Sequence, residues 1–75
     1  MPGIEYVDWN SIETKLRKKF SGKEINLLYD KWIDYGYIHN GAYQYFSFDE
    51  NDSPIEQEVQ RLLDEEEADH IHFSW

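Results

Sequence analysis

The chain has 75 residues and no cysteine, and its 16 acidic and seven basic residues give a formal net charge of −9 at pH 7. Its length allows one small domain, and the lack of cysteine excludes disulfides, thiolate zinc sites and thiol nucleophiles. The core must be built largely from the three Trp, six Tyr and four Phe residues.

The charge is segregated along the chain. Residues 1–31 hold six basic and five acidic residues, whereas residues 32–75 hold eleven acidic residues and a single base, Arg61. Such a field attracts basic surfaces and repels bare nucleic acid and anionic membranes. No apolar run approaches the roughly 20 residues needed to span a bilayer, and the start of the chain has no signal-peptide pattern. We therefore expect a cytoplasmic protein with no membrane partner.

The first 20 residues predict a short lead-in and a helix over 9–20. In the lead-in, Ile4, Tyr6 and Val7 can pack onto the body or form an edge strand, and Asp8 is placed to cap the helix. The apolar positions of the helix recur at 3-4-4 spacing: Trp9, Ile12, Leu16 and Phe20. Its other side is basic: Lys15, Arg17, Lys18 and Lys19. These bases are either solvated or paired with the acidic half of the same or a neighbouring molecule, which would permit a homodimer at low salt.

A second helix is expected over 23–35, between stops at Gly22 and Gly36. Its apolar face would consist of Ile25, Leu28, Tyr29, Trp32 and Tyr35. Leu27 falls on the opposite side, where it is either an ordinary exposed residue or a contact residue.

Residues 37–48 predict a β-hairpin. Asn40-Gly41 separates two β-rich runs and favours a two-residue type I′ turn, in which both central residues have positive φ. This turn would pair Ile38 with Tyr43 and leave tyrosines partly exposed.

Residues 53–75 predict a third helix and a last strand. Ser53, Pro54 and Glu56 form a strong helix start with a capping box, and Glu66 falls on the apolar face, so the helix should end near 64–66. The alternating end of the chain predicts a strand with three residues facing inward: Ile71, Phe73 and Trp75. The expected fold is a single α+β domain over 1–75, in the order α-α-β-β-α-β, with a short, mostly antiparallel sheet packed against the helices.

The acidic residues around the third helix are the main candidate for function. Carboxylates at a helix C-terminus oppose the helix dipole, so a sequence chosen for stability alone would place bases there. Seven carboxylates between Glu56 and Asp69 would, on a helix, follow one another at about the phosphate spacing of one DNA strand. The predicted partner-binding residues are Asp49, Glu50, Asp52, Glu56, Glu58, Asp64, Glu65, Glu67 and Asp69, with Tyr43 and Tyr45 as exposed anchors.

These features predict a stoichiometric inhibitor that imitates nucleic acid and blocks a basic nucleic-acid-binding protein, as phage or mobile-element anti-defence proteins do. One alternative is an immunity or antitoxin protein that neutralises a basic nuclease. Another is an acidic structural or accessory subunit whose charge serves only solubility.

Other chemistry has less support in the sequence. A basic helix, a second helix and a hairpin loosely suggest a winged helix-turn-helix, but the net charge opposes direct nucleic-acid binding. His70 and His72 would share a strand face, with Asp69 and His39 as conceivable further metal ligands, a pattern that is common without a metal. No catalytic motif or phosphate loop is present, so we expect neither an enzyme nor a cofactor.

Overall fold

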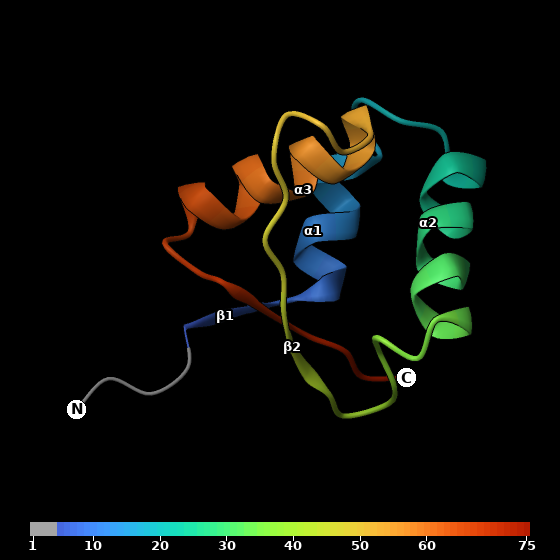
Figure 1. Cartoon of the computed structure of the whole chain (residues 1–75), viewed down its shortest axis with the longest axis vertical. Helices are drawn as coiled ribbons and strands as arrows, with labels where there is room; N and C mark the ends of the chain where they lie inside the picture. The colour runs from blue at the N-terminus through green and yellow to red at the C-terminus, as the bar shows by residue number, and fades with distance from the viewer. Residues whose placement is uncertain (1–4) are drawn as a thin grey trace.

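The computed structural model describes residues 5–75, so that Ile4 of the predicted lead-in lies outside the described residues. In residues 5–75, three helices pack on a three-stranded sheet, which confirms the predicted α+β class (Figure 1). The elements in chain order are β1 (Tyr6–Asp8), α1 (Trp9–Leu16), α2 (Gly22–Asp34), β2 (Tyr43–Tyr45), α3 (Pro54–Glu65) and β3 (His70–His72).

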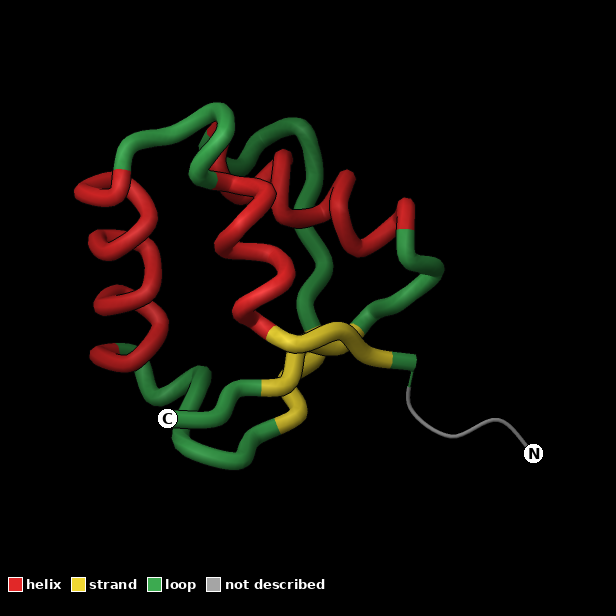
Figure 2. Tube along the Cα trace, turned by 180° about the vertical axis from the view of Figure 1, so that it is seen from behind, coloured by secondary structure: helices red, strands yellow, loops and turns green. Residues whose placement is uncertain are grey.

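The sheet is short and mixed. Its strand order is β1-β3-β2, with β1 parallel and β2 antiparallel to the central strand β3. Figure 2 shows the three short strands together in the lower part of the view, with most of the helical segments above them. Pairing of Val7 and Gln44 with Ile71 places these three residues on the helix side of the sheet. The lead-in therefore supplies the edge strand that was one of its two predicted roles.

The predicted hairpin forms only in part. Residues 43–45 are a strand, but 37–39 are not. Gly41 has a φ of 84°, whereas Glu67 is the only non-glycine residue with positive φ among residues 5–75, so Asn40 cannot complete a type I′ turn. The C-terminal strand takes the place of the missing hairpin partner, because Gly41 N donates to Phe73 O (2.6 Å) and Phe73 N donates to Ala42 O (2.9 Å). Ile38, only 3% exposed, is buried in the core.

Both N-terminal helices differ from prediction at their ends. α1 ends at Leu16 rather than at residue 20, and Asp8 occupies the N-cap position without a side-chain capping bond. The Asp8 carboxylate instead contacts His72 Nδ1 at 3.1 Å. Gly22 begins α2 rather than ending α1, because Ser21 caps α2 by accepting a hydrogen bond from Glu24 N.

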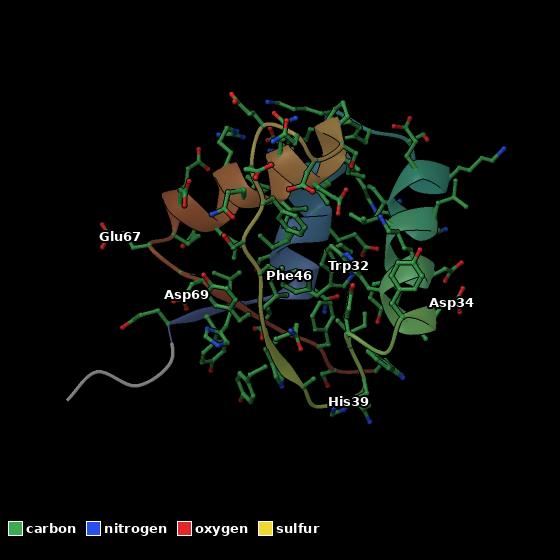
Figure 3. The ribbon with its side chains drawn as sticks, viewed as in Figure 1. Trp32, Asp34, His39, Phe46, Glu67 and Asp69 are labelled. Carbon is green, nitrogen blue, oxygen red and sulfur yellow. The ribbon has the colours of Figure 1, made fainter. Side chains whose placement is uncertain are left out.

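The core is less aromatic than predicted: of its 14 buried hydrophobic residues, ten are aliphatic and four are aromatic, although the four aromatic rings lie close together. The ring centroids of Trp32 and Phe46 lie 4.6 Å apart, and those of Trp9 and Phe73 lie 5.7 Å apart. Figure 3 shows Trp32 and Phe46 near the centre of the molecule. Two predicted inward residues are exposed, Tyr35 (62%) and Trp75 (58%), because α2 and β3 end before them.

Within residues 5–75, none of the helices has the length and apolar character needed to cross a membrane.

Candidate acidic interface

The start of α3 fixes one of the predicted site residues in a structural role. The predicted capping box is confirmed, with Ser53 Oγ accepting from Glu56 N and Glu56 Oε1 accepting from Ser53 N. Ser53 Oγ also donates to Glu56 Oε1 at 2.7 Å. Glu56 is only 9% exposed, and its Oε1 completes the helix start, while Oε2 faces Lys31 Nζ at 4.0 Å.

The acidic loop before α3 is held rigidly against the helix. Asp49 N donates to Asp52 Oδ2, and Asn51 N donates to Asp49 Oδ1, both at 2.8 Å. Gln57 Nε2 donates to Asp52 O at 2.7 Å and to Glu50 O at 3.3 Å. These bonds fix the backbone of the loop while leaving the Asp49 and Glu50 side chains at the surface.

The middle of α3 carries an ion-pair network around Arg61. Its guanidinium donates to Glu58 and Glu65, one turn away on either side, and Lys19 Nζ contacts Glu58 Oε1 at 3.3 Å. The hydrogen bond from Arg61 lowers the pKa of Glu58, and the bond from Lys19 acts in the same direction. The same carboxylates raise the pKa of Arg61. Glu58 and Glu65 are therefore largely neutralised within the chain.

Two lysines at and just after the end of α1 lie against this acidic segment. Lys15 Nζ lies 3.2 Å from Glu66 Oε1, in addition to the contact between Lys19 and Glu58. Two of the four predicted bases thus pair with the acidic half of the same molecule, as one of the predicted alternatives required. Arg17 pairs with Glu13 of its own helix, and Lys18 is exposed. The homodimer at low salt stays a prediction.

The end of α3 has an unusual residue in a common motif. Glu67 N donates to Asp64 O and Ala68 N donates to Leu63 O, the bonds of a Schellman motif, and Glu67 occupies its left-handed position with a φ of 53°. The same motif closes α2, where Gly36 fills that position with a φ of 76°. Glycine adopts this conformation without strain, whereas a glutamate does not.

The outer face of the sheet carries the predicted tyrosines and histidines. Tyr43 stacks on His72 with ring centroids 4.3 Å apart, and Tyr45 meets His70 edge-on at 5.5 Å. Both tyrosines are about half exposed, and Tyr45 lines one groove with Asp52 and Glu56, so it adjoins the carboxylates at the start of α3.

The two histidines of β3 share a face, as predicted, and each bonds a carboxylate through Nδ1. His70 contacts Asp69 at 2.6 Å and His72 contacts Asp8 at 3.1 Å, while His39 lies well apart from Asp69 in Figure 3. No group of three or more potential metal ligands occurs in the part of the chain that the structure describes. We propose no metal site there.

The predicted row of evenly spaced carboxylates does not form. α3 ends at Glu65, the chain turns at Glu67, and Glu56, Glu58 and Glu66 are engaged within the molecule. The carboxylates that remain at the surface gather on the loop before α3 and around its end. We call the six of them that pair with no Lys or Arg among residues 5–75 the acidic surface: Asp49, Glu50, Asp52, Asp64, Glu67 and Asp69.

Charge on the acidic surface is only partly balanced. Residues 49–69 contain ten acidic residues and Arg61, a formal charge of −9, and three lysines reach this segment: Lys15, Lys19 and Lys31. A net charge of −6 therefore remains around α3. Asp49, Glu50 and Asp64 line a shallow groove of about 270 Å³ beside Arg61, which brings the loop and the helix into one surface.

The sequence reasoning missed a larger groove between α2 and residues 44–48, with a volume of about 480 Å³. Exposed rings line it, notably Tyr35 and Tyr37 on either side of the α2 stop at Gly36. The tyrosines flanking this glycine are visible in the sequence, but their position along one groove with Tyr45 depends on the tertiary fold.

Scans against protein-family models, curated proteins and solved structures found no match for the chain.

Proposed function

We propose that the protein acts by stoichiometric binding, using the acidic surface to occupy the nucleic-acid-binding surface of a basic protein. The observation that carries this proposal is the surplus of carboxylates on one side of the fold. After all pairing with Lys and Arg around α3, a charge of −6 remains there, on a loop and helix whose backbones are fixed by hydrogen bonds. A preorganised charged surface of this kind attracts and orients a partner of opposite charge.

The conformation of Glu67 supports a role beyond solubility. A solubilising charge can sit at any exposed position, whereas Glu67 holds a left-handed position in which glycine is favoured. Strained residues are enriched at functional sites. A glutamate in this place is consistent with selection for its charge.

The setting in which such an inhibitor acts would be the cytoplasm, during phage or mobile-element counter-defence. Its action is proposed as binding without catalysis or cofactor.

A competition experiment tests the proposal. The protein, immobilised through its N-terminus, captures basic proteins from a nuclease-treated lysate at low salt, and the bound fraction is then challenged with a short DNA or RNA duplex at constant ionic strength. We expect the duplex to elute a nucleic-acid-binding protein, because the two ligands share one site. Elution by salt but not by duplex would show that the surface does not imitate nucleic acid, and retention of no basic protein would favour a purely solubilising charge.

A further inference from the structure

Buried or partly buried aromatic rings and exposed ones together line the groove between α2 and residues 44–48. Trp32, Phe46 and Phe48 form its floor, with Trp32 and Phe48 stacked at 6.3 Å and an interplanar angle of 16°. Its walls are three more exposed rings, Tyr35 (62%), Tyr37 (50%) and Tyr45 (55%). We call these six residues the aromatic groove.

Charged groups at the aromatic groove show what it can bind. Asp52 and Glu56 line it from the start of α3, and Lys31 is the only cationic side chain lining it among residues 5–75. Lys31 Nζ lies 4.0 Å from Glu56 Oε2 and 6.0 Å from the centroid of the Tyr35 ring. An ammonium of the chain itself thus sits between a carboxylate and an aromatic face, which is the arrangement that recognises organic cations.

Lys31 is held only loosely in this position. Both of its contacts are at the outer limit for their type, and its side chain is 47% exposed. Glu56 Oε1 is engaged by the capping box, whereas Oε2 has no shorter contact than this one among the described residues. A cation with better geometry could therefore displace Lys31.

We propose that the aromatic groove receives an arginine side chain of the basic partner and that Lys31 occupies its place in the free protein. Arginine fits better than lysine because a planar guanidinium can stack on the tyrosine rings while it pairs with a carboxylate through two donors. Asp52 belongs to both the acidic surface and the groove lining, so one partner could contact the two together. This inference rests on the proposed function, because it assumes a basic partner.

The base of a nucleotide also stacks on aromatic rings, but the phosphates of the nucleotide would meet Asp52 and Glu56 in a protein of net charge −9. The charges at the groove favour a cation.

The inference is tested by NMR titration of the whole protein with the amide-capped tripeptide Gly-Arg-Gly. Its citrulline and lysine counterparts are titrated in parallel. We expect chemical-shift changes at residues 31–37 and 44–48 and at the Trp32 indole with the arginine peptide, and clearly smaller ones with the other two. Equal binding of the citrulline peptide would show that the positive charge of the arginine side chain does not contribute to binding. Equal binding of the lysine peptide would overturn the choice of arginine. Shift changes confined to the acidic surface would overturn the site.

Matched variants separate the groove from general electrostatics. Lys31→Ala and Lys18→Ala each remove one positive charge, but only Lys31 lies in the groove. We expect Lys31→Ala to tighten binding of the arginine peptide about two- to fivefold, the range of an exposed cation–π contact, and Lys18→Ala to leave it nearly unchanged. Equal effects of the two variants would contradict the proposal.

Two tyrosine variants test whether the rings of the groove bind the peptide. Together with the duplex competition, they separate failure of this inference from failure of the proposed function. Tyr37→Ala should weaken binding, while Tyr6→Ala, on the outer face of the sheet, should not. A protein that captures a duplex-displaceable partner but shows no groove binding would refute this inference and leave the proposed function intact. A protein whose groove binds the peptide but whose partners resist the duplex would refute mimicry alone.

Discussion

Lys15 Nζ lies 3.2 Å from Glu66 Oε1, although 51 positions separate the two residues, so the end of α1 is tied to the acidic end of α3. Lys19, four residues after Lys15, makes a similar contact with Glu58. The separation of charge along the chain is therefore partly cancelled in space. Most of the acidic charge left around α3 lies on the acidic surface.

Replacing the strained glutamate at the end of α3 should stabilise the fold. Glu67→Gly is expected to raise the free energy of unfolding by about 1 kcal/mol, because glycine adopts positive φ without strain. Urea denaturation measures the effect, with Glu67→Gln as a control that removes the charge but keeps the strained side chain. A destabilised Glu67→Gly variant would show that the position is not strained.

The capping box should contribute to stability in a similar range. Ser53→Ala removes the side-chain acceptor for Glu56 N and is expected to destabilise the protein by about 1 kcal/mol. Thermal unfolding followed by circular dichroism measures the loss. Ser74→Ala, at an exposed position outside the helices and strands, should change the melting temperature little, and equal effects of the two substitutions would contradict this account of the helix start.

The third helix was the most predictable element because its start is encoded locally. Ser53, Pro54 and Glu56 fix the first turn by short-range hydrogen bonds and backbone geometry, and the position of Glu66 set the end of the helix to within a few residues. The prediction of a hairpin was wrong because the partner of a strand is not determined by local sequence. Phe73, 32 positions after Gly41, competes for the same backbone groups.

For the candidate site, the sequence predicts which segments are acidic but not which of their carboxylates stay unpaired in the folded protein. The sequence shows where carboxylates occur, but which of them are neutralised depends on α1 lying against α3, a contact that no local pattern encodes. Glu56 and Glu58, which are predicted to contact a partner, also serve the helix start and the Arg61 network. The aromatic groove was missed for the same reason, because α2 and β2 meet only in the folded chain.

The aromatic core should be far more sensitive to truncation than the exposed rings. Trp32 is 1% exposed and touches Trp9, Phe46 and Phe73, so Trp32→Ala is expected to destabilise by about 3–5 kcal/mol, enough to unfold a domain of this size. Trp75→Ala removes an equally large side chain that is 58% exposed, and this variant should stay folded. Near-UV circular dichroism and urea titration separate the two outcomes. Loss of the fold in Trp75→Ala would place that ring in the core, against the observed burial.

The ion pairs of Glu58 should make stability depend on pH at the acid end. Its folded-state pKa lies below the ordinary value of 4.5, chiefly because Arg61 donates to it, so its contribution is complete above that value and is lost as the pH falls through the lowered pKa. Glu58→Gln should therefore flatten the acid limb of the stability curve. Glu50→Gln, which removes a carboxylate with no ion pair within the described residues, should leave that limb unchanged. A steeper limb in Glu58→Gln would contradict the sign of the shift.

The central claim, that the position of the carboxylates and not the total charge selects the partner, is tested most directly by two triple variants of equal charge. One neutralises the acidic surface (Glu50→Gln, Asp64→Asn, Glu67→Gln), and the other neutralises three exposed carboxylates elsewhere (Glu5→Gln, Asp30→Asn, Asp34→Asn). Both variants have a net charge of −6. Figure 3 shows Glu67 and Asp34 on opposite sides of the molecule.

The measurement is the dissociation constant for the duplex-displaceable partner at moderate salt. We predict that the first variant loses at least about tenfold in affinity, since each lost charge pair in a desolvated interface is worth more than 1 kcal/mol, while the second stays within about threefold of the unmodified protein. Equal losses in the two variants would contradict the claim and reduce the acidic surface to a source of net charge.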